Sequence, residues 1–469
     1  MEPQTKTTKV GGAGQDWRPL LHQLERDGEV VRIASPIARE YEISALMMDL
    51  EKARRYPLVI FENVGGGDVP VVTNALAPRE RLARALDASP HALSEEFAKR
   101  IQTRPGTRRL KEAAFEAVSY AGSEADLGRL PILTHFPIDA GPYITGGLVV
   151  ARDPQSGAET LGFHRMQLKG RDKLGISLHS RQRLWEYLRR AEARGQNLEA
   201  SVVIGVHPAV ALGSMALIPY EEGKFSAIGG LFGEPLEVAK CRTVDLEVPA
   251  WSEIVIEGEI LAGVREAEGP FAEFTNYACY RSTENVFRVK AIQHREKPLY
   301  HGLTPGMSSE HITIVGVQRE GDVLAALNRT LPNVRAVHAP FSACGLFHVY
   351  VSLEKVAEGQ AQQAIFAAFA VDHNIKLVVV VDADVDVYDE REVLWALATR
   401  LQADRGVTIV PQHLGMGCTL DPSTDELSRT AKMGIDATRP LSGFAPTITI
   451  DDGVREAVRR FWPDFGLRH

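Results

Sequence analysis

Two carboxylates bracket a Gly-Pro turn in the segment Glu268-Gly-Pro-Phe-Ala-Glu273. Gly-Pro interrupts a helix and turns the chain, so the two side chains can lie at different depths in the protein. One carboxyl group can then stay ionised while the other carries a proton, which is the division that general acid–base chemistry needs. Taken alone, the hexapeptide is more typical of a solvated surface turn. A catalytic interpretation therefore depends on its surroundings.

A candidate partner for these carboxylates is Arg165, which lies in a predicted strand between Phe163 and Leu168. Burying a guanidinium group is costly unless it meets an anion. The residue is therefore interpreted in one of two ways. It is aimed at a carboxylate or a phosphate, or it belongs to an exposed strand face together with His164 and Lys169.

Two segments rich in small residues, 211–219 and 228–234, would allow a ligand to approach the backbone closely. Such segments can line phosphate or flavin sites. Neither matches a P-loop or the Gly-x-Gly-x-x-Gly fingerprint, so a nucleotide would not be held in those ways.

The acidic run Asp382-Ala-Asp-Val-Asp386 raises the question of a calcium site. It fails the EF-hand pattern, because Val387 stands where the turn glycine is needed and Val393 where the bidentate glutamate is needed. We interpret the run as a strand end that leads through an Asp389 N-cap, with Glu392 three residues later, into a helix.

Three kinds of segment must position these residues. The first part of the chain predicts helices at 16–27, 78–87 and 93–103 and strands at 29–33 and 58–63. The part from 144 to about 297 is mostly strand-like, with one helix at 182–193, and suggests a barrel or sandwich. From 311 onward, helices at 321–330, 359–372 and 390–401 alternate with strands at 347–353, 376–382 and 408–410, which is typical of an α/β layer domain.

Composition limits the class of protein. The 469 residues are 44% hydrophobic and 24% charged, with a net charge of −8, which suits a globular protein of about three domains and argues against nucleic-acid binding. Residues 1–14 contain no apolar run, and the run 202–219 is broken by His207 and Pro208, so neither a signal peptide nor a membrane span is expected. Four scattered cysteines predict buried thiols in a reducing, cytoplasmic compartment. They are Cys241, Cys279, Cys344 and Cys418.

Several windows, in order, together resemble the UbiD family of decarboxylases, over about Asp16 to Gly443. They are Thr160–Arg165 with His179 downstream, Gly213-Ser-Met215, Gly233-Glu234 followed by Val-Ala-Lys-Cys241, Glu268–Glu273, and Lys432–Thr438.

The resemblance implies an α+β multi-domain fold. A disordered leader (1–15) would precede an N-terminal α/β subdomain (16–125). A split β-barrel of the flavin-reductase-like type (126–305) would bind the cofactor. A C-terminal α/β domain (306–445) would mediate oligomerisation, as a homodimer or homohexamer, and a tail helix (446–469) would follow.

The chemistry implied by the resemblance is reversible non-oxidative decarboxylation of an aromatic or α,β-unsaturated acid on prenylated FMN, made by a flavin prenyltransferase. Arg165 would orient the substrate carboxylate, Glu273 would donate the proton that replaces carbon dioxide, and Glu268 would hold Arg165. Loss of carbon dioxide from an sp² carbon needs an electron sink, which explains why no side-chain nucleophile stands out.

The resemblance also implies a set of binding residues. The cofactor would contact Gly162, Phe163, Arg165, Gly213, Ser214, Met215 and Lys376. A divalent metal, usually manganese, often with potassium, would join the cofactor phosphate to His179, Glu234 and an asparagine whose position is Thr160 here. A threonine hydroxyl is a shorter and weaker oxygen ligand than an amide carbonyl, so either Thr160 still binds the metal, directly or through water, or the metal site is altered.

Candidate residues for the substrate pocket are Phe274, Asn276, His301, Val315 and Leu397, which would form a mostly apolar site with a few polar groups. Two alternatives to a decarboxylase stay open. One is a flavin-binding redox or scaffold module that has lost activity, which the threonine at position 160 favours. The other is a non-catalytic assembly protein, which would leave Arg165, Glu268 and Glu273 unexplained.

Overall fold

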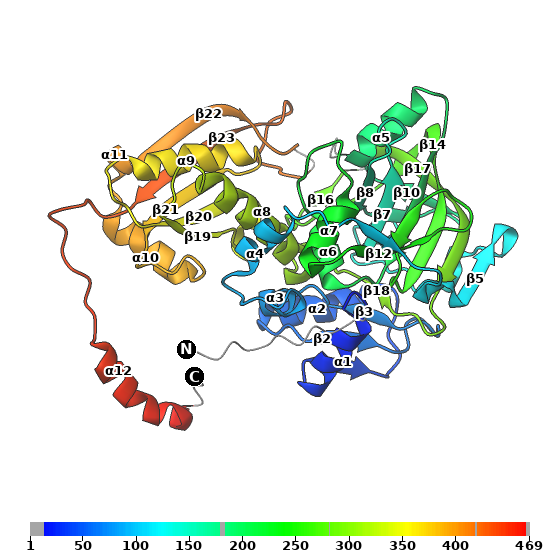
Figure 1. Cartoon of the computed structure of the whole chain (residues 1–469), viewed down its shortest axis with the longest axis horizontal. Coiled ribbons are helices and arrows are strands. Elements are labelled where there is room, and N and C mark those ends of the chain that lie inside the picture. Colours follow the sequence, from blue (N-terminus) through cyan, green and yellow to red (C-terminus); the bar gives the residue numbers. More distant parts are fainter. Residues whose placement is uncertain (1–13, 179–182, 281, 418–419, 466–469) are drawn as a thin grey trace.

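The computed structural model describes residues 14–178, 183–280, 282–417 and 420–465. In Figure 1 the N-terminal segment lies at the bottom in blue, a large sheet lies at the right in cyan and green, and a second α/β unit lies at the left in yellow and orange. None of the helices in these described ranges is long and apolar enough to cross a membrane. Residues 1–13 of the leader predicted at 1–15 lie outside the described residues. Gln15 is buried, and its side-chain amide donates to the Pro235 carbonyl, so this end of the predicted leader is packed against the protein.

The N-terminal unit is a small sheet covered by helices. Its strand order is β1-β2-β3-β18. The strands are β1 (Val30–Ile33), β2 (Leu58–Phe61), β3 (Val71–Thr73) and β18 (Tyr300–His301), and the helices are α1 (Arg18–Arg26), α2 (Glu42–Lys52), α3 (Arg79–Ala85) and α4 (Leu93–Arg100). Strand β18 comes from the end of the central segment and pairs with β3 in parallel. The N-terminal unit is therefore completed by residues more than two hundred positions downstream.

The central unit is built on one antiparallel sheet with the order β6-β9-β10-β17-β14-β11-β7-β8, to which β5 adds by pairing with β17. The strands are β5 (Val118–Ala121), β6 (Tyr143–Ile144), β7 (Gly147–Arg152), β8 (Glu159–Phe163), β9 (Met166–Leu168), β10 (Lys173–Ile176), β11 (Leu198–Ile204), β14 (Ile254–Glu268) and β17 (Ser282–His294). Helix α5 (Arg183–Glu192) packs against it. The mixed α/β, multi-domain organisation is confirmed, but in the described residues the sheet is open, because its end strands β6 and β8 do not pair with each other.

Both segments rich in small residues form helices, α6 (Pro208–Ser214) and α7 (Lys224–Phe232). Glycine is unfavourable inside a helix. In α6 and α7, close packing against neighbouring segments explains why glycine is present. A Cβ atom at Gly230 would lie 2.3 Å from the Arg100 carbonyl oxygen, and one at Gly213 would lie 2.9 Å from side-chain atoms of Ile228 and Leu231. Next to α7 lies a smaller sheet with the strand order β13-β12-β4. Its strands are β13 (Glu247–Pro249), β12 (Leu236–Lys240) and β4 (Thr107–Arg109).

The C-terminal unit is a layered α/β domain, as the alternating pattern predicts. Its sheet has the order β19-β20-β21-β23-β22. The strands are β19 (Val334–His338), β20 (His348–Leu353), β21 (Leu377–Asp382), β22 (Val407–Leu414) and β23 (Arg429–Ala437), and the helices are α8 (Ser309–Leu327), α9 (Gln360–Val371), α10 (Glu390–Arg400) and α11 (Ala403–Gly406). Successive valines of β21 face opposite sides: Val378 and Val380 pack with α8 and α9, and Val379 and Val381 with α10.

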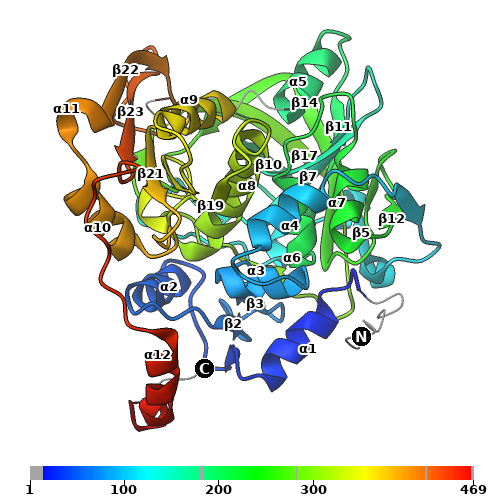
Figure 2. The ribbon, with the colours of Figure 1, turned by 60° about the vertical axis from the view of Figure 1, so that its left-hand side comes forward.

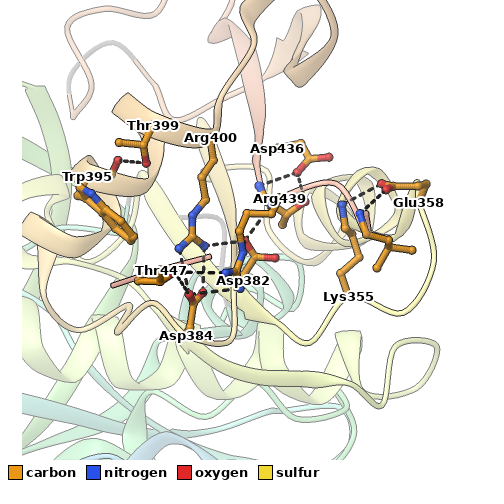
Figure 3. Close-up of polar contacts among 12 residues, drawn as sticks. Lys355, Glu358, Asp382, Asp384, Trp395, Thr399, Arg400, Asp436, Arg439 and Thr447 are labelled. Carbon is orange, nitrogen blue, oxygen red and sulfur yellow. Dashed lines mark hydrogen bonds and ion pairs between the residues drawn. The ribbon is translucent and has the colours of Figure 1, made fainter. Parts of the chain in front are cut away.

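The acidic run after β21 binds arginines. In Figure 3, Asp382 and Asp384 converge on Arg400 and Arg439, with Arg400 2.6 Å from Asp382 and 3.0 Å from Asp384. The Asp389 side chain caps α10 by accepting from the Arg391 N–H at 2.9 Å. The interpretation as a strand end that leads into a capped helix is confirmed.

The tail leaves the domain through this same cluster, where Thr447 donates to Asp384 at 3.4 Å. Beyond it, α12 (Asp452–Val458) and the 3-10 helix Arg459–Phe465 lie apart from the rest of the molecule in both views (Figures 1 and 2). A tail helix is therefore present, and residues 466–469 of the predicted range lie outside the described residues. Large apolar side chains of this tail are exposed, among them Ile448, Val454 and Phe465.

Helix α8 joins the units through the buried carboxylate of Glu320. This carboxylate contacts Arg79 at 2.6 Å and Ser94 on the N-terminal side, and His338 at 2.7 Å and the Ala339 N–H at 3.1 Å on the C-terminal side. Burial alone would raise the pKa of Glu320, but the charge of Arg79 and the hydrogen bonds from His338 and Ser94 lower it to about 2. The ionised carboxylate is thus the form that holds the units together.

We expect Glu320→Gln to lower the free energy of unfolding at pH 7 by about 3 kcal/mol, because one member of a buried charged network is removed. Because the pKa is lowered on folding, the stabilisation is present above about pH 4.5 and is lost as the pH falls towards 2. Urea unfolding at pH 7 measures the change. Glu354→Gln, at an exposed ion pair with Arg335, is the control and should change the free energy by less than about 0.5 kcal/mol; equal losses in both variants would contradict the assignment.

Candidate active site

The turn that carries the two candidate glutamates follows directly from the central sheet. Strand β14 ends at Glu268, Gly269 has a φ of 80°, and β15 (Phe271–Ala272) pairs with β16 (Ala278–Cys279) to form a small hairpin. Glu273 follows β15, and its N–H donates to the Tyr277 carbonyl at 2.8 Å. The hairpin therefore fixes the backbone position of Glu273, which lies five residues after Glu268.

Arg165 lies between β8 and β9 and joins both glutamates. Its Nε and Nη2 atoms donate to the two carboxylate oxygens of Glu268 at 3.0 and 2.8 Å, and its Nη1 atom donates to Glu273. The two-point contact with Glu268 fixes the plane of the guanidinium group. The structure therefore brings together the three residues that the sequence singled out for chemistry.

The three side chains differ in burial. That of Glu268 is 0% exposed, whereas those of Arg165 and Glu273 are each 10% exposed. The guanidinium carbon of Arg165 lies 5.0 Å from the centre of the Phe271 ring, which packs on Tyr143 with ring centres 4.6 Å apart. Burial alone would lower the pKa of Arg165, but the hydrogen bonds and charge of Glu268 raise it. Arg165 is therefore a permanent cation, and Glu273 is the more exposed of the two carboxyl groups.

Asp139 supports the hairpin and is a residue that the sequence analysis did not select. Its carboxylate accepts from the Ala272 N–H at 2.9 Å and from the Phe136 N–H at 2.8 Å. Burial raises its pKa, which the backbone hydrogen bonds oppose. In the sequence, Asp139 could have been selected only because it is a carboxylate in a predicted turn with Pro137 and Gly141.

Residues just after Glu273 contact the C-terminal unit. Phe274 stacks on Phe347, with ring centres 6.2 Å apart, and Thr275 donates to the Leu420 carbonyl at 2.8 Å. A cavity of about 230 Å³ lies at this junction. It is lined by Thr275, Tyr277, Ser342, Ala343, Cys344, Phe347, His348, Lys376, Asp421 and Pro422. Glu273 therefore lies one residue from the boundary between the two units.

Five of the predicted cofactor residues lie just before Arg165 or at the end of α6. The strip Gly162–Arg165 is only partly buried, between the fully buried Leu161 and Met166. Gly213 and Ser214 end α6, and Met215 is its C-cap. A partly open strip beside a buried sheet suits a flat ligand that would cover it. Lys376 lies elsewhere, in the cavity at the junction, where it contacts Asp421 at 2.8 Å.

The other predicted pocket residues do not converge. His301 is buried and contacts Glu310 at 2.8 Å, Val315 packs with the helices of the N-terminal unit, and Leu397 packs with α10 and β21. Asn276 has a φ of 64° at the tip of the hairpin. Only Phe274 and Asn276 lie beside Glu273.

The two predicted metal ligands that the structure describes, Thr160 and Glu234, are not brought together. Thr160 follows Glu159, whose carboxylate accepts from the Phe225 N–H at the start of α7 at 3.2 Å. Glu234 lies beyond the other end of α7, after its C-cap Gly233, and faces Gln15 at 3.3 Å and Arg108 at 3.8 Å. Nine helical residues span about 13 Å. His179 lies outside the described residues, and within the described ranges no group of three His, Cys, Asp or Glu side chains could hold a metal. Thr160 and Glu234 therefore do not fit a shared metal site.

Comparison with family models gives three matches along the chain. They are the N-terminal, Rift-related and C-terminal domains of 3-octaprenyl-4-hydroxybenzoate carboxy-lyase, named UbiD_N, UbiD and UbiD_C, at residues 21–101, 108–308 and 312–437.

Curated relatives include two anhydromevalonate phosphate decarboxylases. The one from Methanothermobacter thermautotrophicus is 34% identical over 422 residues, which cover 89% of this chain and 96% of the relative. The one from Aeropyrum pernix is 34% identical over 421 residues, which cover 89% and 92%.

Among solved structures, the UbiD-class enzyme HmfF from Pelotomaculum thermopropionicum in complex with FMN has a TM-score of 0.89 and 39% identity, over 94% of this chain and 99% of that one. An evolved dimeric form of HmfF in complex with prenylated FMN has a TM-score of 0.85 and 37% identity, over 92% and 97%.

Proposed function

Because the chain belongs to the UbiD family of carboxy-lyases, we propose that it catalyses reversible decarboxylation of an aromatic or α,β-unsaturated acid on prenylated FMN. The observation that carries the proposal is Arg165, held by two hydrogen bonds to Glu268 and one to Glu273. A guanidinium group fixed in this way can receive a substrate carboxylate in a defined orientation.

Charge balance supports separate roles for the two glutamates. Arg165 carries one positive charge, and Glu268, whose side chain is fully buried, compensates it through both oxygens. A substrate carboxylate would add one negative charge to this enclosed group. Burying further unpaired charge is costly, so Glu273 would enter the reaction as the neutral acid and hold the proton that is to be transferred.

In the proposed reaction, the bond between the carboxylate carbon and the neighbouring sp² carbon breaks, carbon dioxide leaves, and the electron pair stays on the sp² carbon. The Glu273 proton then forms the new C–H bond. Prenylated FMN, when bound, supplies the electron sink. Arg165 orients the carboxylate, Glu268 holds Arg165, and the partly open strip Gly162–Arg165 with Gly213, Ser214 and Met215 would contact the cofactor. In the reverse direction Glu273 accepts the proton.

Further parts of the proposal follow from the family rather than from the site. A flavin prenyltransferase would supply the cofactor in the cytoplasm. The protein would form a homodimer or homohexamer, which the exposed apolar side chains of the tail, such as Ile448 and Phe465, support. Manganese and potassium are left out of the proposed chemistry, because Thr160 and Glu234 lie next to opposite ends of α7.

Co-expression with a flavin prenyltransferase tests the function. We expect purified protein to carry prenylated FMN, identified by mass spectrometry of the released cofactor, and to release carbon dioxide from at least one acid in a panel of aromatic acids, acrylic acids and anhydromevalonate phosphate. Protein without any flavin would refute the proposal. Protein that carries prenylated FMN but is inactive on the whole panel and its carboxylation products would favour the alternative, a flavin-binding module without decarboxylase activity.

A further inference from the structure

A lysine lies beside the predicted cofactor segment 213–215. Lys224 is the first residue of α7, and its ammonium group donates to the backbone carbonyl of Ser214 at 2.5 Å. Ser214 is one of the predicted cofactor contacts. A protonated lysine has three donors and no lone pair, so Lys224 cannot bind a metal ion in this state and would repel one nearby.

A second cation lies close to Lys224. The guanidinium group of Arg183 donates to the backbone carbonyls of Ile218 and Glu222 at 2.7 Å. In the part of the chain that the structure describes, no carboxylate lies within ion-pair distance of either Lys224 or Arg183. Glu159, the acid at this end of α7, accepts instead from the Phe225 N–H. Within the described residues, the two positive charges thus contact backbone carbonyls and, for Arg183, the face of the Tyr220 ring at 5.3 Å, rather than a carboxylate.

Such an arrangement is unfavourable without an anion. Burial and, to a smaller extent, the charge of Arg183 together lower the pKa of Lys224 to about 7. His164, whose ring Nδ1–H donates to the Ser177 carbonyl at 3.1 Å, also has a pKa lowered by burial and by the charge of Lys224. A ligand with two negative charges would compensate Lys224 and Arg183 together.

We propose that the ammonium group of Lys224 binds the phosphate of the flavin cofactor and takes over the charge-compensating role of a divalent metal, so that this chain binds its cofactor without one. The inference rests on the proposed function, because it requires a flavin phosphate. It accounts for three observations at once: a hydroxyl at position 160, a carboxylate of Glu234 turned towards Arg108, and a lysine beside Ser214 that has no carboxylate partner among the described residues.

Titrations with FMN and riboflavin separate the phosphate contact from the ring contacts, because riboflavin lacks the phosphate. The protein is purified without a prenyltransferase, freed of flavin, and titrated by flavin fluorescence with EDTA and, separately, with manganese; bound metal is measured by mass spectrometry. We expect the wild-type Kd for FMN to agree within about twofold in the two conditions, with no stoichiometric metal in the FMN complex.

Lys224→Met should weaken FMN binding by about 10- to 100-fold, the usual range for a lost charge-assisted hydrogen bond, and leave the Kd for riboflavin within about twofold. Retained riboflavin binding shows that the variant is folded. Lys240→Met, at an exposed lysine that pairs with Asp245, is the matched control and should change neither Kd. Lys224→Glu should weaken FMN binding at least as much as Lys224→Met, since a carboxylate would then repel the phosphate where the ammonium group lies.

The outcomes separate the two levels of the argument. Wild-type protein that binds neither FMN nor riboflavin would refute the proposed function itself. Wild-type protein that binds FMN tightly only with manganese, or a Lys224→Met variant that keeps its preference for FMN over riboflavin, would overturn the inference about Lys224 while the proposed function stands.

Discussion

Replacing Glu273 by glutamine is expected to reduce kcat for carbon dioxide release by about a thousandfold while flavin stays bound. Glutamine has nearly the same shape and can still accept a hydrogen bond from Arg165, but it has no proton to give to the carbon that loses carbon dioxide. Because the side chain lies on the hairpin and the predicted flavin contacts lie on β8 and α6, cofactor binding should be unaffected. Turnover is measured by carbon dioxide release and cofactor content by absorbance of the same preparation.

The matched control for this variant is Glu266→Gln. Glu266 lies on β14 two residues before Glu268 and contacts Lys173 at 2.8 Å on a partly exposed face. The same chemical change there should alter kcat by less than about twofold, because surface ion pairs contribute little. Undiminished decarboxylation by Glu273→Gln would remove Glu273 from its role as proton donor.

Replacing Arg165 by lysine is expected to reduce kcat/KM by about a hundredfold. Lysine keeps the positive charge but cannot make the two parallel hydrogen bonds to Glu268 and the third to Glu273. The substrate carboxylate would then be bound with less defined orientation, and misplacement of a reacting group by about 1 Å can cost a hundredfold in rate. Steady-state kinetics on the acid identified by the panel measure both kcat and KM.

Arg171→Lys is the control for that variant, because Arg171 is an exposed residue that contacts Asp126 at 2.9 Å. It should leave kcat/KM within about twofold. If Arg165→Lys were as active as Arg171→Lys, a charge alone would suffice at this position, and the orienting role assigned to the guanidinium group would be wrong.

Much of the C-terminal unit could be predicted from the sequence, because local patterns and packing agree there. The four valines before Asp382 form β21, and Asp389 caps α10. The start of α8 could not be predicted. Residues 312–315, Ile-Thr-Ile-Val, favour a strand by their β-branched side chains, yet they lie in α8, since burial of Ile312, Ile314 and Val317 overrides local preference. The expected helix therefore began twelve residues too late, at 321 instead of 309.

Some residues of the candidate site could likewise be predicted from the sequence, and others could not. Arg165, Glu268 and Glu273 have residue types that imply chemistry, and the family resemblance connected them across a hundred residues. Lys224 carried no such signal, because a lone lysine beside a glycine is ordinarily a solvated side chain. Lys224 is placed beside Ser214 because it begins α7. This helix was not predicted, since Gly229 and Gly230 disfavour a helix. Asp139 was missed because its partners are backbone N–H groups, which have no sequence signature.

The position of α8 has a consequence for how the chain folds. Near its start, Ser309 and Glu310 bind Glu51 and the Asn74 N–H at 2.8 and 2.9 Å; near its end, Val323 and Leu327 belong to the core of the C-terminal sheet. One helix therefore contributes to two hydrophobic cores. Loss of either core would leave the other with an exposed, partly charged helix. The two halves of the molecule are thus expected to melt together as one cooperative unit, and neither half should persist as an independently folded fragment.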